Sequence, residues 1–103
     1  MKNTEKNIKA KRLEQVAKIL KTIAHPVKLE VLELLGKHEQ LSVSSICSKI
    51  ESGCEISMMS HHLAKMKDNG ILVSEKDGKQ VYYRIADKNL LKIFNCVENC
   101  EFI

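Results

Sequence analysis

The chain has 103 residues, of which 44% are hydrophobic and 29% charged, a balance typical of one globular domain over 1–103. Its four aromatic residues and the lack of tryptophan argue against a protein that stacks single-stranded bases on an aromatic platform. The net charge is +4, and the positive excess lies in 1–24 and 56–86. This distribution is compatible with binding a phosphate backbone.

Apolar runs reach only three residues, and no apolar segment follows the basic N-terminus. We therefore expect neither a membrane span nor a secretory signal. The protein is expected to be cytoplasmic and to have no membrane partner. In that reducing compartment the four cysteines are expected to be thiols, metal ligands or a redox switch rather than structural disulfides.

The N-terminal third is predicted to form two helices. Apolar side chains recur close to every 3.6 residues over 8–23, which predicts a first helix behind a flexible arm over 1–7. Pro26 ends this helix and suits the first turn of a second one over 26–35. Gly36 is expected to cap the end of the second helix.

Two shorter helices follow and are expected to form a helix-turn-helix over 42–69. Ser42 offers an N-cap for a helix over 43–51, and Ser57 offers one for the next. That last helix carries an apolar stripe of Met59, Leu63 and Met66. It is expected to end at Asn69-Gly70.

The C-terminal third predicts a β-hairpin followed by a helix. The β-rich runs 71–75 and 80–86 flank a predicted turn over 76–79 that contains Asp-Gly, a strong hairpin signal, so 71–86 is expected to be a wing. Asp87 is expected to cap a final helix over 88–100. The order α-α-α-α-β-β-α predicts a mainly α fold with a small β-hairpin (α+β), a winged helix-turn-helix domain that binds DNA.

In such a fold the second helix of the pair enters the major groove, and its exposed residues are candidates for DNA contacts. The candidates on this helix are Ser57, Met58, Ser60, His61, His62 and Lys65, and those on the hairpin are Lys76, Lys79, Gln80 and Arg84. Neighbouring residues of a helix point about 100° apart, so one of the two adjacent histidines is expected to be structural. The same geometry argues against a two-histidine metal site and a catalytic dyad, and we expect no enzyme.

From about residue 20 to 100 the chain resembles the ArsR/SmtB family, bacterial winged-helix repressors that respond to metals, arsenite or thiol oxidants. The matching stretches are Ala24-His25-Pro26, Leu29, Leu32, Leu35, Leu41-Ser42-Val43, Ser57, Ser60, His62-Leu63, Gly70-Ile71-Leu72-Val73, Gly78-Lys79 and Val81-Tyr82-Tyr83. The resemblance implies a homodimer built by the first and last helices, bound to an inverted-repeat operator in double-stranded DNA. It also implies repression that an effector relieves.

The effector sites of the family are mostly missing. Where members that sense through the third helix have Cys-Val-Cys, this chain has Ser42-Val43-Ser44. Where members that sense zinc through the last helix have Asp-x-His and His-x-x-Glu, this chain has Asp87 and Asn89, then Cys100 and Ile103. The usual zinc site is therefore not expected, and no cofactor is certain.

Cys96 and Cys100 are four residues apart and therefore share one face of the predicted last helix. Two protomers could gather four thiolates there for a soft metal ion, or oxidation could link thiols, with Cys47 as a possible partner. Alternatively, these cysteines, like Cys47 and Cys54, have no sensing role. Two other functions stay open: a protein-interaction module without DNA binding, and a small thiol- or metal-buffering protein.

Overall fold

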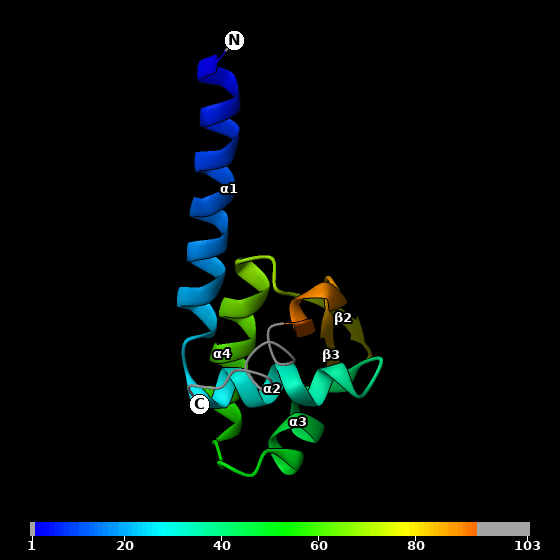
Figure 1. The fold of residues 1–103 in the computed structure, drawn as a ribbon. Coiled ribbons are helices and arrows are strands. Elements are labelled where there is room, and N and C mark those ends of the chain that lie inside the picture. Colours follow the sequence, from blue (N-terminus) through cyan, green and yellow to red (C-terminus); the bar gives the residue numbers. More distant parts are fainter. Residues whose placement is uncertain (1, 93–103) are drawn as a thin grey trace.

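The computed structural model describes the backbone of residues 2–92 and the side chains of residues 9–92. In this part of the chain the elements are α1 (Lys2–Ile23), α2 (Pro26–Gly36), β1 (Leu41–Ser42), α3 (Val43–Lys49), α4 (Ile56–Asp68), β2 (Leu72–Asp77), β3 (Gln80–Ile85) and the 3₁₀ helix η1 (Lys88–Leu91). Figure 1 shows the N-terminal part of α1 extending well beyond the body that the other elements form. The predicted order of four helices, a hairpin and a further helical turn is confirmed.

Helix α1 begins at Lys2, so the flexible arm predicted over 1–7 differs from the structure, in which residues 2–7 are helical. The segment contains neither glycine nor proline, the two residues least compatible with a helix. The helix ends before Pro26, where His25 has an extended backbone with φ −156° and ψ 131°. Its C-terminal end joins the core, since Ile23 is buried and Ile19 packs against the buried residues.

Helix α2 starts as the sequence predicts, but its end differs. The Nδ1 atom of His25 accepts a hydrogen bond from the Val27 N–H at 3.1 Å and caps the helix. Gly36 is not the predicted C-cap: it is the last helical residue, and Lys37 follows in the right-handed region. The glycine instead leaves room for another element, because a Cβ atom there would lie 2.9 Å from a Cδ atom of Leu91.

The helix-turn-helix pair lies where it was predicted, with shifted starts and ends. Ser42 caps α3, since its Oγ accepts from the Ser45 N–H at 3.2 Å, but α3 ends at Lys49 rather than at residue 51. The predicted Ser57 cap of α4 is wrong. Glu55 is the extended residue before the helix, and its carbonyl accepts from the Met59 N–H at 2.8 Å, which places Ser57 inside the first turn.

The wing is part of a three-stranded antiparallel sheet in the order β1-β3-β2. Asp77 pairs with Gln80, so the turn between β2 and β3 has two residues, and the predicted four-residue turn over 76–79 is too long. Gly78 has φ 64° at the first position of this turn, a conformation that favours glycine. Strand β1 was not predicted, because its two residues are too few to show a periodic pattern; Leu41 pairs with Tyr83.

Asp87 caps the element after the sheet, as predicted, by accepting from the Asn89 N–H at 2.9 Å. This element starts as the 3₁₀ helix η1, and the rest of the helix predicted over 88–100 lies outside the described residues.

A single apolar core connects α2, α3, α4 and the sheet. Its fully buried side chains include Val31, Leu35, Ile46, Met59, Leu63, Met66 and Ile71. The predicted stripe of α4 is therefore confirmed, and it fixes which face of α4 points away from the body. Within the residues that the structure describes, no helix has the length and apolar character needed to cross a membrane.

Candidate nucleic-acid interface

Helix α4 presents a polar face on the side opposite its buried stripe. Of the residues predicted to contact DNA, those exposed on this helix are Ser57, Met58, Ser60, His61 and Lys65. Five of the six residues predicted on this helix are thus accessible to a partner. We call these five residues the α4 face.

His62, the sixth predicted residue, lies differently. It is half-buried, and its ring centroid is 5.0 Å from that of His25 at the start of α2. Burial lowers the pKa of His62 first, and the nearby His25, Lys28 and His61 lower it further. One of the two adjacent histidines was expected to be structural. In the structure this residue is His62, and His61 is exposed.

The turn between α3 and α4 is held by a carboxylate from α2. Glu30 accepts hydrogen bonds from the Glu51 N–H at 2.6 Å, the Ser52 N–H at 3.2 Å and the Ser52 hydroxyl at 2.6 Å. The bond from the Ser52 hydroxyl, followed by that from the Glu51 N–H, lowers the pKa of Glu30. The sequence analysis missed this residue, and no local pattern marks it, because its partners are 21 and 22 positions away.

The predicted wing residues are exposed on the hairpin. Lys79 lies in the two-residue turn beside Gly78, Gln80 starts β3 opposite Asp77, and Lys76 lies on β2. Arg84 is exposed lower on β3, opposite Val73. At the wing tip, Lys76 and Lys79 flank Asp77, so the tip has a small excess of positive charge. Contacts of this kind suit a phosphate backbone rather than a base edge.

Helix α1 carries an apolar stripe that the described residues leave uncovered. Leu13, Val16 and Leu20 are spaced i, i+3 and i+7, so they share one face, and they are 60%, 46% and 48% exposed. Ile19 and Ile23 of the same helix pack on the core. The five residues form one broad apolar stripe, in which Ile19 and Ile23 pack on the core while Leu13, Val16 and Leu20 have no partner among residues 9–92.

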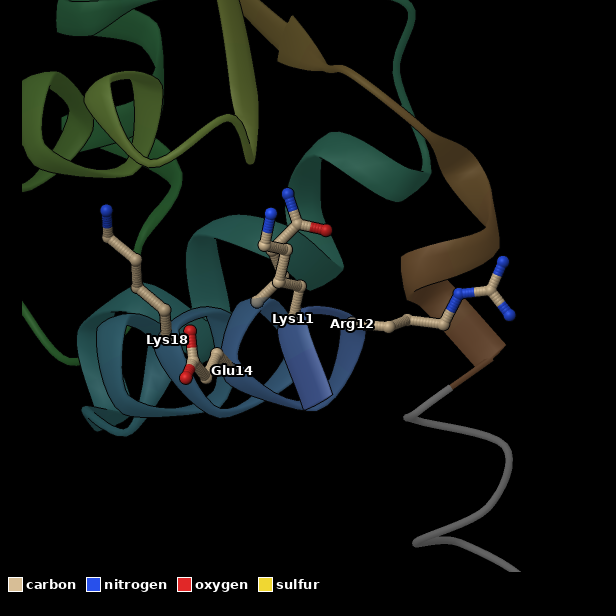
Figure 2. A pocket seen from close by; sticks show the side chains of 5 residues that line it. Lys11, Arg12, Glu14 and Lys18 are labelled. Atoms are coloured by element: carbon tan, nitrogen blue, oxygen red, sulfur yellow. The ribbon is translucent and has the colours of Figure 1, made fainter. Parts of the chain in front are cut away.

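A shallow depression of about 610 Å³ runs along α1 and is lined by Lys11, Arg12, Glu14, Gln15 and Lys18. Figure 2 shows that the side chain of Arg12 extends in another direction than those of Lys11 and Lys18, which stand apart from each other. A small-molecule site needs polar groups that converge on one point. The depression is therefore not a candidate ligand site.

Two of the four cysteines lie in the described part of the chain. Cys47 on α3 and Cys54 before α4 are free thiols, half-buried against the core. Burial, and secondarily the proximity of Cys54, raises the pKa of Cys47. Cys96 and Cys100, the predicted metal or redox pair, lie outside the described residues. Among residues that the structure describes, no three side chains of His, Cys, Asp or Glu cluster in a way that could hold a metal ion.

Comparisons with known proteins agree with this architecture, although no protein-family model matches the chain. It is 33% identical over 89 residues to the transcriptional repressor PagR of Bacillus anthracis, which covers 84% of this chain and 87% of PagR. It is also 31% identical over 90 residues to the HTH-type transcriptional regulator Rv0324 of Mycobacterium tuberculosis. That match covers 87% of this chain but only 38% of Rv0324, so the chain spans well under half of that regulator.

Among solved structures, the chain is similar to the homodimeric winged helix-turn-helix DNA-binding domain Mb0332 of Mycobacterium bovis, described as a possible ArsR-family transcriptional regulator. The TM-score is 0.73 and the identity 30%, over 87% of this chain and 81% of that domain. The predicted winged helix-turn-helix fold and the absence of an enzymatic function are both consistent with these relatives. The chain belongs to the ArsR/SmtB family of winged helix-turn-helix transcriptional regulators.

Proposed function

We propose that this protein is a cytoplasmic, homodimeric repressor that binds an inverted-repeat operator and leaves it when a soft metal ion or a thiol oxidant reaches its cysteines. The observation that carries the proposal is the rigid presentation of the α4 face. Its opposite side is buried in the core, and the turn before it is held by Glu30. Such a surface enters a groove without first having to be ordered.

The chemistry of the α4 face supports reading of base edges. Ser57, Ser60 and His61 offer neutral donors and acceptors near the start of the helix, the part that reaches the bases in this class of fold. Lys65 lies further along and suits a phosphate. On the wing, Lys76, Lys79, Gln80 and Arg84 are proposed to contact the flanking backbone or the minor groove.

The exposed stripe of α1 supports the dimer. Leu13, Val16 and Leu20 together form an exposed apolar patch on α1, and a second copy of α1 would cover this patch. A two-fold dimer presents two copies of α4, so its operator is expected to be an inverted repeat with half-sites about one helical turn apart. Mb0332, the structural relative, is described as homodimeric.

For the effector we propose the last predicted helix as the sensing element. Cys96 and Cys100 share one face by their spacing, and the family resemblance assigns that helix to the dimer interface. Cys47 is less suited to sensing, because its raised pKa keeps the thiol protonated and the thiolate is the reactive form. A coupling free energy of about 1–3 kcal/mol between effector and operator would change operator affinity roughly 5–150-fold.

Fluorescence anisotropy tests the proposal. Reduced, metal-free full-length protein is titrated onto an inverted-repeat duplex from upstream of its own gene and onto a random duplex of equal length. The complex is then challenged separately with a soft metal ion, Cd²⁺, and with a thiol oxidant, diamide. We expect tighter binding to the operator, steep weakening with salt, and release by one of the two challenges.

The variant Cys96→Ser/Cys100→Ser is expected to bind the operator and to ignore the effector, whereas Cys47→Ser is expected to respond normally. A failure to bind either duplex at low salt contradicts the repressor and favours a protein-interaction module. An unchanged response of the double variant contradicts the assignment of the effector site.

A further inference from the structure

Two large apolar side chains are exposed where α4 begins. Ile56 is 59% exposed and Met58 is 50% exposed, while the adjacent Met59 is completely buried. Single exposed apolar residues are ordinary on a protein surface. These two, however, occupy the first turn of the helix that we propose enters the major groove, among serine and histidine side chains.

Their spacing places them on different sides of α4, since residues two apart point about 160° away from each other. Met58, His61 and Lys65 follow each other at i, i+3 and i+7, which aligns an apolar group, an imidazole and a cation on the α4 face. Ile56 is three and seven residues before the buried Met59 and Leu63, so it continues the core-facing stripe instead. In the row of the α4 face, Met58 is the residue nearest the helix N-terminus, the end that reaches base edges in helix-turn-helix proteins.

In the major groove the hydrophobic feature of the base-edge code is the C5-methyl group of thymine; the other edges present hydrogen-bond donors and acceptors. Met58 offers those edges only a thioether sulfur, which is a weak acceptor. We propose that Met58 reads a thymine methyl group in the operator half-site. This inference rests on the proposed DNA binding and adds the base that the first turn of α4 recognises.

Replacing thymine by deoxyuridine tests the inference, because this removes the methyl group and keeps every hydrogen-bonding atom of the base pair. A half-site is first selected with the full-length protein from a random-sequence duplex library. Each thymine of the selected site is then replaced in turn, and affinity is measured by fluorescence anisotropy. At one or two thymines we expect about fourfold weaker binding, the effect of one buried methyl group.

A variant assigns the methyl group to the side chain. Met58→Gln has nearly the same length but a polar end, so it is expected to bind the thymine duplex more weakly and to lose the thymine–deoxyuridine difference at one position. Ile56→Thr, in the same turn but on the other side of α4, is the matched control, and Val73→Thr on β2 is a second one. Both change an exposed apolar residue and are expected to keep both affinities. Because all three side chains are exposed, circular dichroism is expected to show unchanged folding.

The outcomes separate the two proposals. If no sequence is enriched from the library, sequence-specific DNA binding is wrong, and the inference fails with it. If a site is enriched but deoxyuridine at every position leaves affinity unchanged, DNA binding stands and methyl recognition is wrong. If deoxyuridine weakens binding equally in the wild type and in Met58→Gln, the methyl group is read by a residue other than Met58.

Discussion

The ring of His25, which caps the start of α2, lies 5.0 Å from the ring of His62 on α4, with an angle of 41° between the two planes. This contact joins the first turn of α2 to the helix that we propose reads DNA. It also explains why two adjacent histidines have different environments. His62 packs against another helix, whereas His61 faces solvent.

The His62 contact predicts a pH dependence of stability. The pKa of His62 is lowered from 6.5 in the folded protein, chiefly by burial and then by His25, Lys28 and His61. The unfolded chain therefore takes up a proton at higher pH than the folded one, so protonation favours unfolding. The stability associated with a neutral His62 is complete above about pH 6.5 and is lost as the pH falls toward the lower, folded pKa.

Urea unfolding between about pH 5 and 7 measures this effect. His62→Gln is expected to reduce the slope of the unfolding free energy against pH. His61→Gln removes only one of the neighbours that lower the pKa of His62 and is expected to reduce the slope less. A variant at position 62 with the wild-type slope would contradict the assignment of the titrating group.

The hydrogen bonds to the Glu30 carboxylate are expected to protect the turn between α3 and α4 from hydrogen exchange. Glu30→Gln replaces one acceptor oxygen by an NH₂ group, which cannot accept from the Glu51 N–H or from the Ser52 groups. Hydrogen exchange at the Glu51 and Ser52 amides is therefore expected to become faster, with protection of α4 retained. Glu33→Gln, on the same helix and exposed, is the matched control. Unchanged exchange at both amides would show that the carboxylate does not hold the turn.

Because the pKa of Glu30 is lowered in the folded protein, its contribution to stability is expected to fall in acid. The carboxylate contributes stability above the unfolded pKa of about 4.5, and this contribution is lost as the pH falls through the folded pKa. In the wild type, exchange at Glu51 and Ser52 is expected to lose protection in acid. In Glu30→Gln this acid-dependent step is expected to be absent.

The α4 face and the wing are predicted to contribute differently to DNA binding. Ser60→Ala or His61→Ala should lower discrimination between operator and random DNA by about 1–3 kcal/mol if a base contact is lost. Lys79→Ala should weaken both kinds of binding about equally and reduce the salt slope by about one. Competition anisotropy at several salt concentrations measures both effects. Equal losses on the two duplexes for Ser60 and His61 would mean that these side chains do not read sequence.

The apolar stripe of α1 predicts the oligomeric state. Leu13→Gln/Val16→Gln is expected to shift the protein toward monomer in sedimentation equilibrium, because fully burying each such side chain contributes about 1.5–3 kcal/mol. Binding to an inverted repeat should weaken in parallel, while the circular dichroism spectrum stays the same. Lys18→Gln, on the opposite side of α1, is the control. A dimer of wild-type strength in the double variant would exclude this stripe from the interface.

Features that depend on near neighbours in the chain could be predicted from the amino-acid sequence. The helical period put Met59, Leu63 and Met66 on one buried face, and Asp-Gly marked the hairpin, because both signals act over a few residues. The order of elements then identified the winged helix-turn-helix fold. The Ser57 cap failed for a local reason: the chain already enters the helix at Glu55, without a side-chain cap.

Features whose partners are distant in the chain became visible only in the folded protein. Glu30 holds a turn more than 20 residues away, Gly36 makes room for Leu91, and His62 rather than His61 turns toward α2. Strand β1 exists because Leu41 and Ser42 lie beside β3. Such contacts leave no periodic trace in the sequence, since they arise only when the buried faces of separate elements pack together and fix which side chains meet.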